Sequence, residues 1–307
     1  MKYIKSTTEF YIEEPTVISL GKFDGIHRGH ELLLEQLLKK KQEGYKTVIF
    51  TFDIPPKKVI GSEDVKVLTT NEEKMHMFES FGIDYLIECP FTPEIMTMEP
   101  ECFIEMLVKK LSVKCIVAGE DFCFGHNRRG NYQMLKEYAD KLSYEAIILP
   151  KMKEERRDIS STFVREEISA GRIERANKLL GYPYFVSGQV KHGKQIGRTI
   201  GFPTVNVLPA KNKLLPPNGV YYSRVAYKGN IYAAISNVGY KPTVSTEKVM
   251  GVESYLYDFD EEIYEEDVEI YLCSFKRGEK QFAGVEELKK QLAEDIRDGA
   301  LRNDSCR

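Results

Sequence analysis

The sequence has little of what marks a membrane, secreted or nucleic-acid-binding protein. No hydrophobic run approaches the length of a membrane span, and the first ten residues, MKYIKSTTEF, lack the apolar run of a signal peptide. Basic residues are not in excess, because the formal net charge is -3. We therefore expect no membrane partner and no nucleic acid as a ligand.

Cysteine is present, but not in the spacing of a metal site. The cysteines include no C-x-x-C pair, so we expect neither structural zinc nor a disulfide framework. Scattered thiols of this kind favour a reducing cytoplasm. The residues concerned are Cys89, Cys102, Cys115, Cys123, Cys273 and Cys306.

The length and composition fit a globular protein of two domains. The chain has 307 residues, of which 42% are hydrophobic and 30% are charged. It contains neither a repeat of fixed period nor a low-complexity tract. The domain organisation is therefore inferred from the order of the expected strands and helices.

The first half alternates strand-like and helix-like segments. Residues 16–20 (TVISL) and 46–52 (KTVIFTF) predict strands, and residues 30–44 between them predict a helix. This βαβ unit implies a parallel sheet with right-handed crossovers. The alternation continues with strands at 84–90, 115–119 and 145–150 and helices at 69–82 and 100–111. We predict a doubly wound, Rossmann-like α/β domain.

The second half is built differently. Short runs rich in Tyr and Val are separated by Gly, Pro or Asn, which predicts an antiparallel barrel. Within it, Gly229-Asn230 is a hairpin turn signal. Residues 284–301 predict a closing amphipathic helix. We place the domain boundary near Gly181, which gives domains 1–181 and 182–307. The expected strands are residues 184–190, 201–208, 219–238, 252–259 and 266–275.

The segment GKFDGIHRGH, residues 21–30, lies where a ligand site is expected. Ligands bind beyond the carboxyl ends of parallel strands, and a helix N-terminus there favours an anion. Glycines let the backbone approach a phosphate, and His27 and His30 can donate hydrogen bonds to it. Two alternatives stay open. In the first, Gly25 only makes a turn and one of the histidines only caps the helix or packs. In the second, the histidines bind zinc.

A second segment, ISSTFVRE at residues 159–166, has the chemistry of a triphosphate clamp. Its hydroxyl groups and the guanidinium of Arg165 stand at an expected helix start. Taken alone, the segment is also explained by a helix cap followed by a surface helix.

Together the two segments resemble the nucleotidyltransferase superfamily, which transfers a nucleotidyl group from a nucleoside triphosphate. The matching patterns are G-x-F-D-G-x-H-x-G-H and I-S-S-T-x-x-R. The resemblance implies that His27 and His30 stabilise the α-phosphate transition state and that Arg165 is a catalytic contact to the triphosphate. It also implies nucleotide contacts by Gly21, Phe23, Asp24, Gly25, Ser160, Ser161 and Thr162.

Further segments narrow the resemblance. Residues 117–130 (VAGEDFCFGHNRRG) resemble the GxDFxFG stretch of bacterial FAD synthetases, which implies flavin contacts by Asp121 and Phe124. Residues 197–206 (GRTIGFPTVN) resemble the G-x-P-T-x-N signature of riboflavin kinases. Residues 252–264 and 275–282 resemble the glutamate-containing strand of these kinases and the segment before their last helix.

The kinase resemblance implies roles in the second half. Thr204 and Asn206, two apart and so on one face of a strand, would hold Mg²⁺ with the ATP phosphates. Glu253 would act as general base and Arg277 would contact the flavin. Two purely structural explanations stay open. The segment GFPTVN is then only a strand with a proline bulge, and Glu253 is only one solvated carboxylate in an acidic segment. The implied ATP contacts of this half are Gly197, Gly201 and Pro203.

The sequence departs from the family pattern at three places. Pro55 stands where family members often have histidine in T-F-x-P-H-P, and Lys241 stands where arginine is common. The segment RGEKQF differs from the usual R-P-E-x-K-F. The last two differences concern the flavin side of the kinase, whereas the expected ATP contacts keep the family pattern.

The match covers nearly the whole chain in the right order, and the chain resembles the bifunctional riboflavin kinase/FMN adenylyltransferase family. This implies a cytoplasmic enzyme that acts on riboflavin, FMN, FAD and ATP with Mg²⁺; the oligomeric state is left open. One rival is a nucleotidyltransferase for a phosphopantetheine or a pyridine mononucleotide. Another makes the barrel a non-catalytic module that binds a regulatory ligand or RNA.

Overall fold

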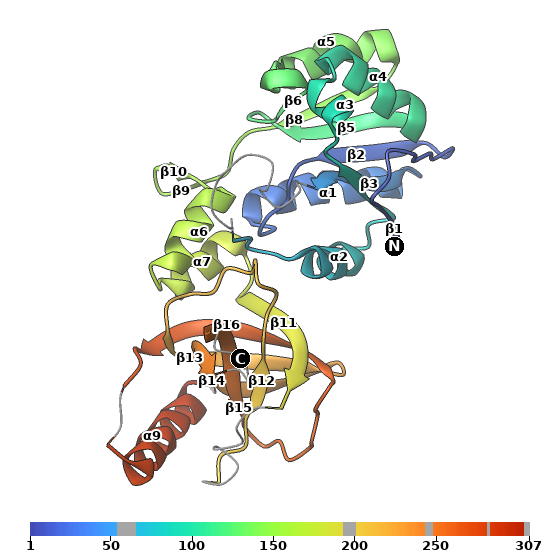
Figure 1. Ribbon diagram of the computed structural model, residues 1–307. Helices are drawn as coiled ribbons and strands as arrows, with labels where there is room; N and C mark the ends of the chain where they lie inside the picture. Colours follow the sequence, from blue (N-terminus) through green and yellow to red (C-terminus); the bar gives the residue numbers. More distant parts are fainter. Residues whose placement is uncertain (54–65, 193–200, 243–247, 281–282, 304–307) are drawn as a thin grey trace. The chain divides into compact units, whose positions relative to one another are not determined.

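The computed structural model describes residues 1–53, 66–192, 201–242, 248–280 and 283–303 (Figure 1). The chain divides into two compact units, Met1–Ser161 and Thr162–Arg307. Pro55 and Gly197 lie outside the described residues, as does the side chain of Lys241. The domain boundary near Gly181 stays a prediction.

The first unit contains a six-stranded, all-parallel sheet in the order β1-β4-β3-β2-β5-β8. This confirms the predicted α/β domain and adds an edge strand, β1, that the sequence patterns did not predict. The strands are β1 (Lys2–Lys5), β2 (Thr16–Leu20), β3 (Lys46–Asp53), β4 (Tyr85–Pro90), β5 (Val113–Gly119) and β8 (Glu145–Leu149). Two short hairpins add β6 (Cys123–Phe124), β7 (Gly130–Asn131), β9 (Lys153–Glu154) and β10 (Arg157–Asp158).

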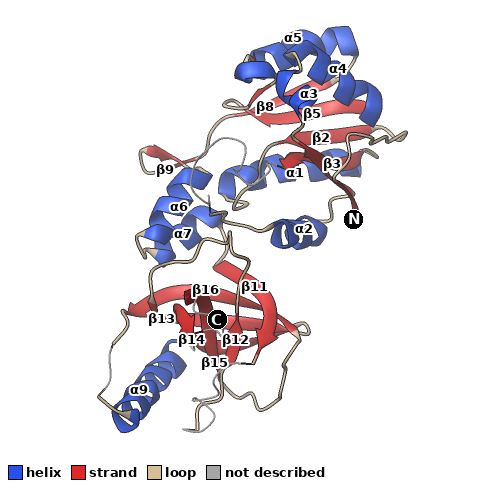
Figure 2. Cartoon of the chain, viewed as in Figure 1, coloured by secondary structure: helices blue, strands red, loops and turns tan. Residues whose placement is uncertain are grey.

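Helices cover both faces of this sheet (Figure 2). On one face, α1 and α2 enclose a core that includes Val17, Leu34 and Ile49. On the other face, α4 and α5 enclose a core that includes Phe50 and Phe103. The side chains of β2 and β3 alternate between these cores because successive strand residues point to opposite faces. The helices are α1 (Arg28–Gln42), α2 (Asn71–Ser80), α3 (Pro93–Thr97), α4 (Pro100–Leu111) and α5 (Tyr132–Leu142).

The second unit contains a closed antiparallel barrel in the order β11-β12-β15-β14-β13-β16, as the sequence predicts. Its strands are β11 (Tyr184–Lys191), β12 (Val205–Val207), β13 (Gly219–Tyr227), β14 (Asn230–Pro242), β15 (Lys248–Leu256) and β16 (Asp267–Arg277). The helices are α6 (Ser161–Ser169), α7 (Ile173–Leu180) and α9 (Val285–Asn303). Helix α6 begins at Ser161, which is the last residue of the first unit.

The hairpin between β13 and β14 turns one residue earlier than the sequence signal suggests. Lys228 and Gly229 are its central residues, with φ of 46° and 81°, and Asn230 already pairs with Tyr227. Positive φ at both central residues is the geometry of a type I′ turn, which suits the twist of a two-residue hairpin. The predicted hairpin is confirmed, with Lys-Gly in place of Gly-Asn at its tip.

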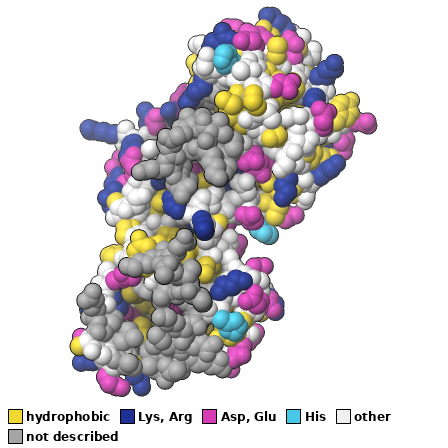
Figure 3. Space-filling model, in the orientation of Figure 1, with side chains coloured by type: hydrophobic (Ala, Val, Ile, Leu, Met, Phe, Trp, Pro, Cys, Tyr) yellow, Lys and Arg dark blue, Asp and Glu magenta, His cyan; other side chains and the backbone are white. Residues whose placement is uncertain are grey.

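Surface features agree with the charge balance of the sequence. On the face drawn in Figure 3, acidic and basic side chains are interspersed rather than gathered by sign. Among the described helices, none is long and apolar enough to span a bilayer.

Candidate active sites

The segment after β2 places two histidines at the start of α1. His27 is the N-cap residue, in an extended conformation, and its carbonyl accepts hydrogen bonds from the amides of His30 (2.7 Å) and Glu31 (3.1 Å). The two imidazole rings stack, with centroids 3.8 Å apart and planes inclined by 14°. Both histidines therefore stand at the N-terminus of α1, where the helix dipole favours an anion.

Burial favours the neutral form of both histidines, and one ring nitrogen of each lacks a hydrogen-bond partner in the described part of the chain. His27 is 6% exposed, and burial lowers its pKa to about 4. Burial, and then the neighbouring His27, lower the pKa of His30 well below its ordinary value. The Nδ1 atoms of both rings are buried and have no hydrogen-bond partner among the described residues. Two unpartnered ring nitrogens at a helix N-terminus suit a phosphate group.

The turn before the histidines has a conformation that explains its composition. Gly25 has φ of +62°, and a Cβ there would lie 2.6 Å from Cδ1 of Leu68. Phe23 also has positive φ (48°), but its ring is buried against His30 and Phe78, with centroids 4.9 and 5.5 Å away. Gly21 bonds through its amide to the carbonyl of Phe50. Gly25 is thus required both by backbone conformation and by space.

Asp24 joins three segments that are distant in the sequence. Its Oδ1 accepts hydrogen bonds from the amides of Leu68 (2.7 Å) and Thr69 (3.1 Å), and its carbonyl accepts one from the Ser161 hydroxyl (2.7 Å). The amide of Gly25 donates to Thr69 Oγ1 at 3.0 Å. The two motifs predicted to form one site therefore meet at Asp24 and Ser161.

The rest of the second motif divides between the units. Ser160 lies in the first unit, half-buried, next to the buried Ile159. Thr162 and Arg165 lie on α6 in the second unit, where Thr162 is exposed and Arg165 is half-buried. The expected helix start is confirmed at Ser161.

The expected flavin contacts of the first unit differ in exposure. Asp121 is exposed and lies 3.5 Å from the ammonium of Lys151. Phe124 is 5% exposed and belongs to the core beside Phe103. The partly buried ring of Phe122 stacks on it at 5.5 Å and was not singled out from the sequence.

In the barrel, the expected kinase residues come together across two strands. Thr204 Oγ1 donates a 2.6 Å hydrogen bond to Glu253 Oε1. Asn206 of β12 is directly opposite Glu253 of β15 in the antiparallel ladder. Directly opposed residues share a face, so all three side chains lie on one side of the sheet. Gly201, with φ of +87°, and Pro203 lead into this strand pair.

That side is the outer face of the barrel. Val252 and Ser254 of β15 are fully buried, and Ser254 Oγ bonds to Ser236 Oγ at 2.6 Å in the interior. Glu253 and Tyr255 alternate with them along the strand and point outward. The ring of Phe202 lies 6.0 Å from that of Tyr255, in an edge-on contact. The outer face thus combines an acidic group, neutral oxygens and aromatic rings.

Arg277, the expected flavin contact, already has a protein partner. Its guanidinium forms a forked ion pair with Asp295 of α9 through Nε, at 3.2 and 3.1 Å from the two carboxylate oxygens, and through Nη2. The sequence patterns did not single out Asp295.

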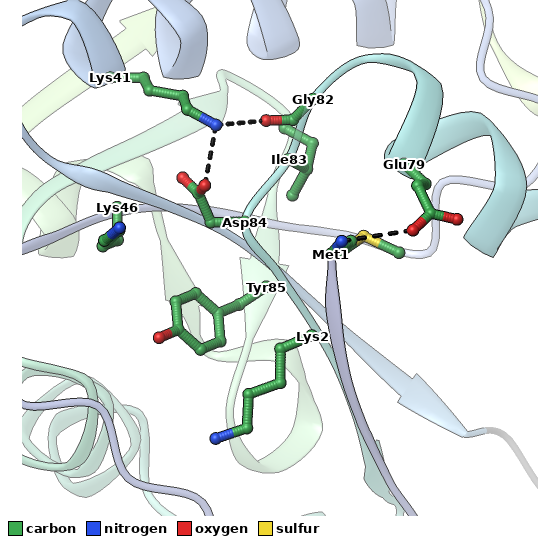
Figure 4. A pocket seen from close by; sticks show the side chains of 9 residues that line it. All are labelled: Met1, Lys2, Lys41, Lys46, Glu79, Gly82, Ile83, Asp84 and Tyr85. Atoms are coloured by element: carbon green, nitrogen blue, oxygen red, sulfur yellow. Dashed lines mark hydrogen bonds and ion pairs between the residues drawn. The ribbon is translucent and has the colours of Figure 1, made fainter.

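Within the described ranges, no group of three or more His, Cys, Asp or Glu side chains could hold a metal ion. A pocket of about 390 Å³ is lined by Lys2, Lys46 and Tyr85, at the amino ends of β1, β3 and β4 (Figure 4). His27 and His30 lie at the carboxyl end of the sheet. The pocket is therefore on the opposite edge from the histidines.

Comparisons with known proteins match both units. The FAD synthetase family model matches residues 10–163, and the riboflavin kinase family model matches residues 180–300. A Listeria monocytogenes bifunctional riboflavin kinase/FMN adenylyltransferase is 36% identical over 295 residues, 95% of this chain and 94% of that protein. A Bacillus subtilis protein of the same name is 34% identical over 289 residues, 91% of this chain and 90% of its own.

A solved structure also matches. A Streptococcus pneumoniae protein described as a macrolide-efflux protein has a TM-score of 0.85 and 31% identity, and the match covers 96% of this chain and 97% of that one. The family models and the relatives agree with each other over both units. The chain therefore belongs to the bifunctional riboflavin kinase/FMN adenylyltransferase family.

Proposed function

We propose that the chain carries out two successive transfers on a flavin, one at each group of residues described above. As a riboflavin kinase and FMN adenylyltransferase, it converts riboflavin to FMN and FMN to FAD. The observation that carries the assignment of the kinase site is the hydrogen bond between Thr204 and Glu253, with Asn206 opposite. We assign the adenylyltransferase to residues 1–181 and the kinase to residues 182–307.

In the kinase reaction, Glu253 accepts the proton of the ribityl hydroxyl as that oxygen attacks the γ-phosphorus of ATP, the bond to the β,γ-bridging oxygen breaks, and ADP leaves. The Thr204 hydroxyl donates to the carboxylate, so it fixes the direction of Glu253 and leaves its own oxygen lone pairs for a cation. Gly201, Pro203 and the undescribed Gly197 contact ATP. Arg277 contacts the flavin.

The same residues fit Mg²⁺. Thr204 and Asn206 supply neutral oxygens on one face, close to the carboxylate of Glu253, and Mg²⁺ prefers oxygen ligands shared with phosphates and water. When bound, the ion neutralises charge on the phosphates of ATP. Thr204 thus both orients Glu253 and, together with Asn206, presents oxygen atoms that would hold the ion.

In the adenylyltransferase reaction, a phosphate oxygen of FMN attacks the α-phosphorus of ATP, and pyrophosphate leaves. His27 and His30 stabilise the charge that develops on the α-phosphate, for which their unpartnered Nδ1 atoms are suited. Ser160, Ser161, Thr162 and Arg165 bind the triphosphate. The remaining proposed contacts are Gly21, Phe23, Asp24 and Gly25 with the nucleotide and Asp121 and Phe124 with the flavin.

We also place the enzyme in the cytoplasm, without a membrane or nucleic-acid partner. The cysteines that the structure describes are all free thiols, and the charge balance provides no basic excess. Riboflavin, FMN, FAD and ATP are therefore the ligands proposed for this chain.

A coupled assay tests the whole proposal. Riboflavin and ATP are incubated with the protein, with and without added Mg²⁺, and products are separated by chromatography. We expect FMN to appear first and FAD to follow, both lost when the divalent cation is chelated. A parallel reaction receives FMN in place of riboflavin, and FAD formed only in that reaction would show that the barrel is a binding module without kinase activity. FMN as the only product, with no FAD formed, would contradict the proposed role of the histidines in FAD formation.

A further inference from the structure

Asp295 of α9 is a buried carboxylate with two cationic partners from the end of β16. It is 1% exposed and forms the forked pair with Arg277. The ammonium of Lys276 lies 3.1 Å from Asp295 Oδ1, and Gln291 Nε2 donates to the same oxygen at 3.1 Å. A buried carboxylate is costly unless it is paired and hydrogen-bonded. This one is satisfied in full by groups from two elements.

The pair fixes the guanidinium of Arg277 in one orientation. Nε and Nη2 are bonded to Asp295, and Nη1 donates to the carbonyl of Gly278 at 3.0 Å. Each guanidinium nitrogen therefore has a partner. A planar fork held in this way loses little further entropy when it meets a substrate.

The same pair holds α9 against the barrel. One residue after Asp295, the carbonyl of Ile296 accepts a 2.6 Å hydrogen bond from the Tyr257 hydroxyl. The side chain of Ile296 packs against an apolar cluster on the outer face of the barrel. The cluster consists of Val220, Tyr222 and Ile235, which are buried, and the partly buried Tyr255.

This cluster reaches the proposed kinase residues. Tyr255 is two residues after Glu253 on the same outward face of β15, and its ring meets that of Phe202, two residues before Thr204. The contacts run without a break from Asp295 through Ile296 and Tyr255 to the strand that carries Glu253. Asp295 itself has no contact with Glu253 or Thr204 among the described interactions.

We propose that Asp295 is a positioning residue of the kinase site, which orients Arg277 and seats α9 on the outer barrel face beside Glu253. The proposal rests on the kinase function proposed above. Asp295 touches no substrate and acts through Arg277 and Ile296. Its loss therefore weakens the binding of riboflavin more than it slows the chemical step.

The test is the variant Asp295→Asn in the full-length chain, which keeps the shape and removes the charge. We expect the KM for riboflavin to rise about ten-fold or more, as for the loss of a charge-assisted hydrogen bond, with a smaller change in kcat and in the KM for ATP. Asp298→Asn is the matched control. Asp298 is 53% exposed and contacts the same Lys276 at 2.9 Å, so its variant removes an exposed carboxylate of α9 in place of the buried one.

A double-variant comparison separates positioning from general stability. If Asp295 acts in part through Arg277, then the KM of the double variant Arg277→Gln with Asp295→Asn rises by less than the product of the two single effects. If Asp295→Asn does not fold, Arg277→Lys serves instead, because lysine keeps the charge and loses the fork. Thermal unfolding confirms that each variant is folded.

The outcomes decide between the inference and the function on which it rests. A wild-type protein that does not phosphorylate riboflavin overturns the proposed function. An active wild type in which Asp295→Asn and Arg277→Lys match Asp298→Asn overturns the positioning role. Equal rises in the KM for riboflavin and the KM for ATP also overturn it, because they indicate a barrel that is damaged as a whole.

Discussion

The hydroxyl of Thr204, the residue before β12, donates a 2.6 Å hydrogen bond to the carboxylate of Glu253 on β15. The two residues are 49 positions apart in the sequence, and the closed barrel brings them together. The bond orients the carboxylate through Oε1, as the proposed role of Glu253 as general base requires. A positioned base of this kind is distinguishable from a solvated carboxylate by experiment.

Glu253→Gln keeps the side-chain shape and removes the base. A positioned general base contributes roughly 10²–10⁴ to a rate, so we expect FMN formation to fall by about that factor at saturating ATP. FAD synthesis from supplied FMN should stay near normal. The amide variants of Asp258, Asp260, Glu261 and Glu262 are controls, and losses of equal size in all five variants would contradict the assignment.

His27→Ala and His30→Ala should each reduce FAD formation strongly while FMN formation survives. Removing one preorganised donor from a developing phosphate charge costs on the order of 10²–10³ in rate. Both rates are measured on the full-length chain. The exposed His76 of α2 provides the control variant, His76→Ala. Normal FAD formation in the folded His27 and His30 variants would show that the stacked pair serves packing alone, and loss of bound zinc would support the metal alternative.

The buried His27 should make the protein less stable as the pH falls. An unfolded histidine binds its proton near pH 6.5, whereas folded His27 binds it at about 4. Between these values the unfolded state binds more protons, so stability present above pH 6.5 is lost as the pH falls towards 4. For this one group we expect a loss of about 2 kcal/mol between pH 7 and pH 5. Denaturant unfolding at the two pH values measures it.

The variant His27→Gln checks the origin of this pH dependence. It removes the titrating group, so its loss of stability between pH 7 and pH 5 should be smaller than that of the wild type. An equal loss in both proteins would assign the pH dependence to other groups. Saturating ATP should reduce the loss of stability of the wild type between pH 7 and pH 5. A bound phosphate favours the charged imidazole, so it raises the pKa of folded His27.

Gly25→Ala should destabilise the first unit and impair FAD formation. Gly25 and Gly44 both have positive φ, at +62° and +98°, so alanine is strained at both positions. A Cβ at Gly25 would also lie 2.6 Å from Leu68, whereas nothing lies within 4 Å of a Cβ at Gly44. We expect the drop in unfolding free energy for Gly25→Ala to exceed that for Gly44→Ala by ~1–3 kcal/mol. Equal values would mean that Leu68 moves aside freely.

The proposed boundary near Gly181 predicts that the two activities can be separated. A fragment of residues 183–307 contains Thr204, Asn206, Glu253 and Arg277, so it should phosphorylate riboflavin and make no FAD. The assay is chromatography of FMN and FAD, with circular dichroism to show that the fragment is folded. A folded fragment without activity, beside an active full chain, would mean that the kinase needs residues before 183.

The sequence predicts most of the fold because the strand and helix periods are clear. The runs TVISL and KTVIFTF become β2 and β3, and the Tyr- and Val-rich segments become the barrel. The edge strand β1 was not predicted, since KYIK is only four residues long and is polar at both ends. The hairpin tip lies at Lys228-Gly229 because the strand register pairs Tyr227 with Asn230 and leaves these two as the loop residues, and one local dipeptide does not determine that register.

The candidate sites were predicted less completely. The residues of the motifs could be named, but the part that Asp24 plays depends on the amides of Leu68 and Thr69, more than forty residues away. No local pattern contains such a contact. Asp295 gave a weaker signal that can be recognised afterwards: it stands between Leu292 and Ile296 on the apolar side of a helical pattern. A carboxylate there needs a cationic partner, which the sequence alone does not identify.

The edge strand β1 has a consequence for how this chain folds during synthesis. Lys2–Lys5 pairs in parallel with Tyr85–Glu88, so about 80 residues are synthesised between this strand and its partner. Closing so long a loop costs entropy before any ladder bond forms. The central strands β2 and β3 are nearer in sequence and can pair earlier. During synthesis, β1 therefore joins the edge of the sheet after the central strands β2 and β3 have paired.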